Sequence, residues 1–395
     1  MLPKKLIKQL NDRKANNALR KFGTQEYLID FSSNDYLGFA SSKTIFDNAH
    51  KFMIQKKMYQ NGATGSRLLS GNHKLYIETE ELLRKFHNAE AALIFNSGYD
   101  ANIGFFAAVP QRGDVILYDE LIHASIRDGI QMSNAKSYKF KHNSLHDLQK
   151  RYQQVISNIE NPTQSPHVYV VTESVFSMDG DTPDLHSFVT FCKKHQCHFI
   201  VDEAHAVGIF GNQGVGLLQQ LGIENQVFAR IITFGKAMGC HGAVVLGSTT
   251  LKTYLTNYAR SLIYTTGLPP HSLATIITAY EELKATPNII RLHNNIRLFN
   301  QKLKEHHLEH LFIKSSSAIH CCIVPGNENI KSIAYKIQQK NFDIKPILHP
   351  TVPKGQERLR FCIHSYNSIV EISEVIELLA TFVDKQKGEH ITHFL

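Results

Sequence analysis

The stretch FIVDEAH, residues 199–205, decides the fold class of this chain. Its first three residues are apolar, and the run then turns to Asp202 and, three residues later, His205. A short run that is apolar on both faces and ends in polar residues indicates a strand buried on both sides, as in a parallel sheet covered by helices. Polar side chains at the carboxyl end of such a strand lie where α/β sheets bind ligands.

The same pattern recurs along the first two thirds of the chain, with helical stretches between the runs. The further examples are AALIF (91–95), VYVVTES (168–174), RIITFGK (230–236) and GAVVLG (242–247). We therefore predict an α/β fold with a mostly parallel sheet in a large domain. Polar residues that close these runs, Glu173, Asp202, His205 and Lys236, are expected at one edge of that sheet.

Lys236 lies in TFGKAMG (233–239), a turn with small residues on both sides of the lysine. Such a turn lets the ammonium reach into a crevice at a strand end, where desolvation lowers its pKa and makes it a nucleophile toward an aldehyde. The alternative is a phosphate-binding or surface lysine. Asp202 precedes Lys236 by 34 residues, which allows one βαβ step between neighbouring strand ends.

A third motif, FNSGYDAN (95–102), runs from a strand through Ser97, Gly98 and Tyr99 into a helix. Backbone N–H groups at a helix N-terminus bind phosphate well. The alternative is a plain strand–helix turn. A strand-end acid such as Asp202 fits the ring nitrogen of pyridoxal phosphate (PLP), because a protonated ring withdraws electrons. The alternative for Asp202 and His205 is a capped strand end with a satisfied histidine.

Bulk composition fits a globular protein and anionic ligands. The chain has 395 residues, 43% hydrophobic and 20% charged, with a formal net charge of +8. A basic balance suits a phosphorylated cofactor or a CoA or acidic carrier-protein substrate. We expect no nucleic-acid partner, because no zinc-finger, basic-zipper or Lys/Arg–aromatic pattern occurs.

Six cysteines form no CxxC pair, which indicates free thiols in a reducing compartment. Cys192 and Cys197 lie beside histidines, but the spacing fits no standard zinc pattern, so we expect ordinary packing and no metal. No apolar run is long enough to span a bilayer, so no membrane role is expected. The basic stretch 1–22 favours an amphipathic helix, which could belong to the mature protein or to a mitochondrial presequence. We predict a cytoplasmic location.

The pattern of strands and helices in the sequence changes after about residue 270. PPHSLATIITAYEEL begins a long helical stretch, and AIHCCIV, RLRFCIH and a final helix near 369–384 follow. We predict three parts: an N-terminal helix and segment (1–45), a large PLP-binding domain (46–270) and a smaller α+β C-terminal domain (271–395).

Seven strings together resemble the α-oxoamine synthase family of fold-type I PLP-dependent transferases, over nearly the whole chain. They are FSSNDYLGFA (31–40), GATGSRLLSGNH (62–73), ESVFSMDGDTPDL (173–185), DEAHAVGIFG (202–211), TFGKAMG (233–239), IYTTGLPP (263–270) and PTVPKGQERLR (350–360). Within the family, FSMDGD, LIYTTGLPP and PTVP followed by RLR look most like the branch that serves biotin biosynthesis. NALRKF places Arg20 where that branch keeps a substrate-binding arginine.

The resemblance implies a catalytic set of Lys236, which binds PLP covalently and acts as general base, with Asp202, His205 and His123. Asp202 would hold the ring nitrogen, His205 and Ser177 the phenolic oxygen, and His123 would stack on the ring. The implied phosphate ligands are Gly98, Tyr99 and Thr233, joined by Thr265 and Thr266 of the second subunit of a homodimer. The implied substrate-binding residues are Arg20, Asn34, Thr351 and Arg360.

The activity that the resemblance implies is decarboxylative condensation of L-alanine with a pimeloyl thioester, carried on CoA or an acyl carrier protein. One alternative is another branch of the family, which joins glycine or serine to a different acyl-CoA. A second alternative is a non-catalytic subunit with the same fold. Such subunits usually lose the lysine, so the presence of Lys236, Asp202 and His205 together disfavours this alternative.

Overall fold

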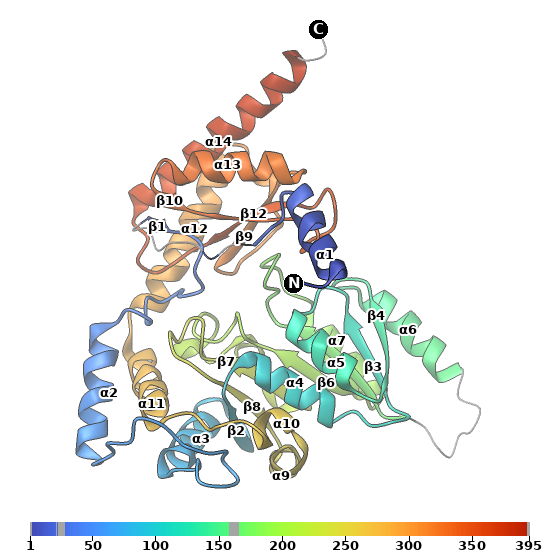
Figure 1. Cartoon of the computed structure of the whole chain (residues 1–395), viewed down its shortest axis with the longest axis vertical. Coiled ribbons are helices and arrows are strands. Elements are labelled where there is room, and N and C mark those ends of the chain that lie inside the picture. Colours follow the sequence, from blue (N-terminus) through green and yellow to red (C-terminus); the bar gives the residue numbers. More distant parts are fainter. Residues whose placement is uncertain (1, 21, 23–27, 158–165, 393–395) are drawn as a thin grey trace. The chain divides into compact units, whose positions relative to one another are not determined.

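The computed structural model describes residues 2–20, 22, 28–157 and 166–392 (Figure 1). Its contacts divide the chain into two compact units. The larger unit comprises Leu37–Ser177 and Thr182–Ile289, and the smaller one comprises Met1–Tyr36, Met178–Asp181 and Ile290–Leu395. The boundaries at residues 45 and 270 stay a prediction about the domains, which this grouping by contacts does not test.

The larger unit is built on a seven-stranded sheet with the order β2-β8-β7-β6-β5-β3-β4. The strands are β2 (Ala91–Phe95), β3 (Val115–Asp119), β4 (Lys136–Phe140), β5 (Val168–Glu173), β6 (His198–Asp202), β7 (Ala229–Thr233) and β8 (Ala243–Gly247). Strands β4, β3, β5, β6 and β7 run parallel to one another, whereas β8 is antiparallel to both β7 and β2. The mostly parallel sheet is therefore confirmed, and β6 and β7 are neighbours as the spacing of Asp202 and Lys236 suggested.

Helices alternate with these strands, as the sequence pattern predicted, and α4 and α5 lie in front of the sheet in Figure 1. The helices are α2 (Lys43–Gln55), α3 (Lys74–Phe86), α4 (Gly98–Ala108), α5 (Ala124–Met132), α6 (Leu145–Ser157), α7 (Leu185–Lys194), α8 (Leu217–Gln220), α9 (Thr249–Tyr258), α10 (Arg260–Ile263) and α11 (Pro270–Ala285), with 3₁₀ turns η2 (Asn212–Gly214) and η3 (Glu224–Gln226). Side-chain caps explain several helix starts, because Ser42, Ser97, Asp184 and Ser248 each accept a backbone N–H from the first turn.

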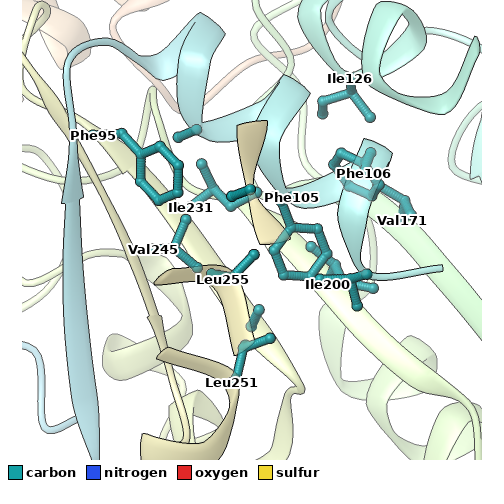
Figure 2. Packing of buried hydrophobic residues seen from close by; sticks show 14 of the residues in the cluster. Phe95, Phe105, Phe106, Ile126, Val171, Ile200, Ile231, Val245, Leu251 and Leu255 are labelled. Carbon is teal, nitrogen blue, oxygen red and sulfur yellow. The ribbon is translucent and has the colours of Figure 1, made fainter. Parts of the chain in front are cut away.

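The core of the larger unit packs α4 against the sheet (Figure 2). Phe105 and Phe106 of α4 are fully buried and belong to one cluster with Val171, Ile200 and Ile231 of three strands. Burial of each large apolar side chain contributes about 1.5–3 kcal/mol. This packing holds the first turn of α4 next to the ends of β6 and β7, where the polar residues of interest lie.

Close approach between α4 and α5 depends on a glycine. A Cβ atom at Gly129 of α5 would lie 2.9 Å from the backbone oxygen of Asn102 and 2.9 Å from Cβ of Phe106. Any larger residue would push α5 away from α4. The distance between the two helices determines how far His123 and Ser125, at the start of α5, lie from Asn102 on α4.

The smaller unit carries a three-stranded antiparallel sheet with the order β11-β12-β9, and β1 pairs in parallel with β10. Its elements are α1 (Lys4–Ala15), β1 (Ile29–Asp30), α12 (Asn288–Glu305, in this unit from Ile290), η4 (Glu309–Leu311), β9 (Ile319–Ile323), α13 (Asn327–Gln338), β10 (Phe342–Asp343), β11 (Lys345–Ile347), β12 (Arg358–Cys362) and α14 (Ile369–Thr392). The predicted strands in AIHCCIV and RLRFCIH are β9 and β12, and the predicted final helix is α14. Within the described residues, no helix combines the length and apolarity that a bilayer span requires.

Candidate active site

A cavity of about 150 Å³ opens at the carboxyl ends of β5, β6 and β7 in the larger unit. Six of the predicted cofactor residues line it together with five others. The full lining is Gly98, Tyr99, Asn102, His123, Ser125, Glu173, Asp202, Ala204, Ile231, Thr233 and Lys236. The fold therefore gathers residues that are up to 138 positions apart in the sequence, Gly98 and Lys236, around one space.

Lys236 reaches this space from the turn after β7. Its Nζ lies 2.6 Å from Nε2 of His205, which is 3% exposed. When Lys236 is an ammonium it can only donate, and Nε2 of His205 is then the acceptor of this hydrogen bond. The turn closes through a hydrogen bond from Gly239 N to the Lys236 carbonyl at 2.8 Å, and Gly239 has a positive φ of 60°. Glycine is favoured at that position, as the small-residue pattern of TFGKAMG suggested.

Asp202 is the last residue of β6 and is 6% exposed. Its Oδ1 accepts the backbone N–H of Ala204 at 2.9 Å, and its Oδ2 accepts Nδ2 of Asn102 at 3.1 Å. These bonds hold the carboxylate in one orientation in a site with little water. Such a carboxylate stabilises a cationic N–H group placed beside it.

Glu173, the last residue of β5, is the register partner of Asp202 and is 3% exposed. Burial and the neighbouring Asp202 carboxylate raise the pKa of Glu173 to about 8. Its Oε1 accepts the backbone N–H of His123 at 2.6 Å. Glu173 therefore ties the end of β5 to the segment that enters α5.

His123 caps α5 and borders the cavity with a solvent-exposed side chain. Its Nδ1 accepts the backbone N–H of Ser125 at 3.2 Å. Partial removal from water and the nearby Lys236 ammonium lower the pKa of His123. The ring is therefore biased toward its neutral form at the mouth of the cavity.

The turn between β2 and α4 has the features expected of a phosphate site. Ser97 caps α4 by accepting the backbone N–H of Asp100 at 3.1 Å. Gly98 and Tyr99 follow in the first turn, where backbone N–H groups lack intrahelical partners and the helix dipole is positive. A Cβ atom at Gly98 would lie 3.3 Å from Oγ1 of Thr233, so this hydroxyl adjoins the same turn.

Four predicted cofactor residues stand outside the cavity lining as the structure describes it: His205, Ser177, Thr265 and Thr266. His205 lies beside Lys236. Ser177 is buried at 8% exposure. Thr265 and Thr266 are held by Asn96, the residue after β2. Asn96 Nδ2 donates to Oγ1 of Thr265 at 3.1 Å and to the carbonyl of Thr266 at 2.7 Å. The segment that carries both threonines is thus fixed to the start of the β2–α4 turn of its own chain.

The predicted substrate residues belong to the smaller unit. There, Nη2 of Arg360, on β12, donates to Oδ1 of Asn34 at 2.9 Å, and Tyr36 OH donates to the same oxygen at 3.0 Å. Arg360 is 8% exposed. The structure therefore brings Asn34 and Arg360 together, and the sequence did not single out Tyr36.

Arg20 and Thr351 are both exposed, whereas Arg360 is buried. The segment before Arg20 is anchored on α13. Asn17 donates from Nδ2 to Oε1 of Glu328 at 2.8 Å and accepts from Nζ of Lys331 at 2.6 Å. These contacts hold the backbone three residues before Arg20 in place. They do not involve the guanidinium group of Arg20.

Sequence reasoning missed three polar residues at the cavity edge or next to it: Asn96, Asn102 and Ser125. Asn102 is 3% exposed and Ser125 is 1% exposed. A buried amide on a helix as apolar as α4 is unusual, and it is the signal that would have singled out Asn102. No comparable signal marks Ser125 or Asn96 in the sequence.

The residues around the cavity fit PLP. A phosphate would find the first turn of α4 and the Thr233 hydroxyl, a ring N–H would find Asp202, and an aldehyde would find Lys236. Buried Oδ1 of Asn102, also in the lining, has no hydrogen-bond partner among the described residues. An unpaired buried acceptor next to Asp202 suits a ligand that carries donors.

This fold and this donor set define a fold-type I PLP-dependent enzyme, and comparison with known proteins gives the family. The family profile of aminotransferase class I and II matches residues 26–377. The 8-amino-7-oxononanoate synthase of Emericella nidulans is 38% identical over 375 residues, which is 91% of this chain and 90% of that protein. The chain belongs to the aminotransferase class I and II family.

Solved structures show the same fold. Serine palmitoyltransferase from S. paucimobilis, solved with PLP–myriocin bound, superposes with a TM-score of 0.85 at 26% identity and covers 96% of each chain. The 8-amino-7-oxononanoate synthase of Francisella tularensis gives a TM-score of 0.75 at 28% identity, covering 92% of this chain and 100% of that one. The chain is thus a PLP-dependent acyl-transferring enzyme of the α-oxoamine synthase type.

The raised pKa of Glu173 predicts a pH dependence of stability in the cofactor-free protein. Because its pKa is about 8 in the folded chain and 4.5 ordinarily, the folded state binds the proton more tightly between these values. The stabilisation is full below pH 4.5 and is lost as the pH rises through 8. A whole-proton difference lowers the free energy of unfolding by about 1.4 kcal/mol per pH unit. Glu173→Gln should flatten this slope in thermal melts between pH 5.5 and 8.5.

Glu281→Gln is the matched control, since Glu281 is exposed and its pair with Lys284 lies on the surface of α11. It should keep the slope of the unmodified protein. Equal slopes for Glu173→Gln and the unmodified protein would show that Glu173 is ionised in the folded chain at neutral pH.

Proposed function

We propose that this chain joins L-alanine to a pimeloyl thioester and releases 8-amino-7-oxononanoate, CO₂ and the free thiol carrier. The observation that carries the proposal is the 38% identity to 8-amino-7-oxononanoate synthase along about nine tenths of both chains. A bond forms between the α-carbon of alanine and the thioester carbonyl carbon as the C–S bond breaks. The bond to the alanine carboxylate then breaks, CO₂ leaves, and the α-carbon takes up a proton in its place.

Bound PLP supplies an aldehyde that takes the amino group and a ring that withdraws electrons from the α-carbon. Lys236 anchors the cofactor and takes the α-proton, for which its place beside His205 on the cavity wall is suited. Asp202 keeps the ring nitrogen protonated, because its buried carboxylate favours a cation next to it. His205 and Ser177 would hydrogen-bond the phenolic oxygen of the cofactor, and His123 would cover the face of its ring.

Substrate binding is assigned to the smaller unit. Arg360, held by Asn34, takes the carboxylate of the amino acid, because a guanidinium group pairs bidentately with that group. Arg20 and Thr351 orient the acyl group. Both side chains are exposed, which leaves them open to a long substrate. The net charge of +8 suits an acyl chain delivered on CoA or on an acidic carrier protein. We place the reaction in the cytoplasm.

The proposed active form is a homodimer in which Thr265 and Thr266 of each subunit bind the cofactor phosphate of the other. Large apolar side chains are exposed before, within and after the GATGSRLLSG segment (62–71), and next to the threonines. They are Phe46, Ile54, Tyr59, Leu68, Leu69, Ile77 and Tyr264. Exposure of so many apolar side chains on one unit supports a protein partner.

A second candidate is condensation of serine or glycine with a different acyl-CoA. The TM-score of 0.85 to serine palmitoyltransferase, against 0.75 to an 8-amino-7-oxononanoate synthase, favours keeping the serine reaction in view. Both reactions use the same cofactor groups, so only the substrates separate them.

Thiol release distinguishes the two candidates. Purified protein is offered L-alanine, glycine or L-serine, each with pimeloyl-, acetyl- or palmitoyl-CoA. We expect the highest kcat/KM for L-alanine with pimeloyl-CoA, with 8-amino-7-oxononanoate identified by mass. Lys236→Ala serves as the control and should lose at least ~1,000-fold in kcat, since anchor and base are both removed. A higher kcat/KM for L-serine with palmitoyl-CoA would assign the chain to the other reaction.

Mixed dimers test the shared site. One subunit carries Lys236→Ala, the other Thr265→Val with Thr266→Val, and differently tagged chains allow the mixed dimer to be purified. Each parent dimer should be nearly inactive, and the mixed dimer should regain one of its two sites, because one site then holds the intact lysine and both threonines. A mixed dimer no more active than its parents would show that each chain builds its site alone.

A further inference from the structure

Two buried residues that the proposed reaction does not use, Asn102 and Ser125, connect Asp202 to His123. Asn102 is 3% exposed on α4, and Ser125 is 1% exposed at the start of α5. Both line the cavity. The contacts run in sequence, from Asp202 through Asn102 and Ser125 to the ring of His123.

The direction of each hydrogen bond follows from the chemistry of the groups. Asn102 Nδ2 has two hydrogens and makes two contacts, with Oδ2 of Asp202 at 3.1 Å and with Oγ of Ser125 at 2.9 Å. The amide must face Asp202 with its nitrogen, because a carboxylate accepts and cannot donate. Oγ of Ser125 therefore accepts from Asn102, and its own hydrogen is free to point elsewhere.

That hydrogen has an acceptor within reach, since Oγ of Ser125 lies 2.7 Å from Nδ1 of His123. The backbone N–H of Ser125 also points at Nδ1, at 3.2 Å. A backbone N–H is always a donor, so two donors meet at Nδ1. A proton on Nδ1 would face both of them. The ring must then carry its proton on Nε2.

We propose that Asn102 and Ser125 are positioning residues that hold His123 as a neutral ring with its proton on Nε2. The inference deepens the proposed function, because it rests on His123 facing the cofactor and substrate. A neutral ring with an N–H donor covers a cationic cofactor without repelling it and offers a hydrogen bond to an incoming carboxylate or carbonyl oxygen. Glu173 completes the arrangement by holding the backbone N–H of His123.

The charges around His123 fall on both sides. Lys236 and Arg127 disfavour a positive ring, and Asp202 and Asp128 favour it. The two donors at Nδ1 add to the first pair. Removal of the ring from water is the largest of the effects on its pKa and also favours the neutral form. The relay of hydrogen bonds from Asn102 through Ser125 to Nδ1 acts in the same direction.

The experiment detects directly which ring nitrogen of His123 carries the proton. PLP-loaded protein is labelled with ¹⁵N in its histidine side chains, and spectra of solid samples are recorded from pH 5 to 8. A His123→Gln sample assigns the signal of His123. We expect Nδ1 to be bare and Nε2 to be protonated. Ser125→Ala should raise the pKa of His123 by about 0.5–1 pH unit, the worth of one hydrogen bond, and let a proton appear on Nδ1.

Ser125→Thr is the matched control, because it keeps the hydroxyl, and it should give the spectrum of the unmodified protein. Asn102→Asp should reverse the direction of these hydrogen bonds and move the proton of His123 to Nδ1. The new carboxylate accepts from the Ser125 hydroxyl, whose oxygen then accepts from Nδ1–H. If Asn102→Asp does not fold, the comparison of Ser125→Ala with Ser125→Thr tests the proposal by itself. A proton on Nδ1 in the unmodified protein, or a lower melting temperature of Ser125→Ala with an unchanged His123 signal, would overturn the proposal.

These outcomes are independent of the substrate screen. A failed screen with the expected spectra would remove the proposed reaction and leave the relay. An active enzyme with a proton on Nδ1 of His123 would remove the relay and leave the reaction.

Discussion

The pairing of Glu173 with Asp202 across β5 and β6 is the constraint on which the rest of the site depends. Parallel neighbours place the two carboxyls at one sheet edge, and both are nearly buried. Two negative charges there would be costly, because little water screens them. The raised pKa of Glu173 favours its neutral form, so one of the two negative charges is avoided. Hydrogen bonds from Asn102 and Ala204 stabilise the carboxylate of Asp202. A site of this kind favours positive charge, and Lys236 supplies one at its wall.

Much of the larger unit could be predicted from the sequence because its strands are apolar on both faces. That pattern identified the sheet, and the polar residues that interrupt it at the strand ends, Glu173, Asp202 and Lys236, line one cavity. The turn from β2 into α4 could equally be predicted from Ser97 and Gly98. In each case the signal is local, since the type of residue changes within one or two positions.

The contacts that depend on distant elements could not be predicted in the same way. Asn102 and Ser125 meet because Gly129 lets α5 approach α4, a fact of tertiary packing. Asn96 holds Thr265 and Thr266 across 169 and 170 positions, and nothing in FNSGYDAN points to that partner. The roles of Arg20 and Thr351 came from resemblance alone, and both side chains are exposed on the smaller unit with no local pattern that defines a site.

The most direct test of the account is to locate the covalent attachment of the cofactor. The protein is loaded with PLP, reduced with sodium borohydride to fix the link between lysine and cofactor, digested and sequenced by mass spectrometry. The geometry of the cavity, with Lys236 on its wall next to His205, predicts one modified peptide that carries the group on Lys236. Attachment to a different lysine, or label spread over several surface lysines with Lys236 unmodified, would contradict the assignment of this cavity as the active site.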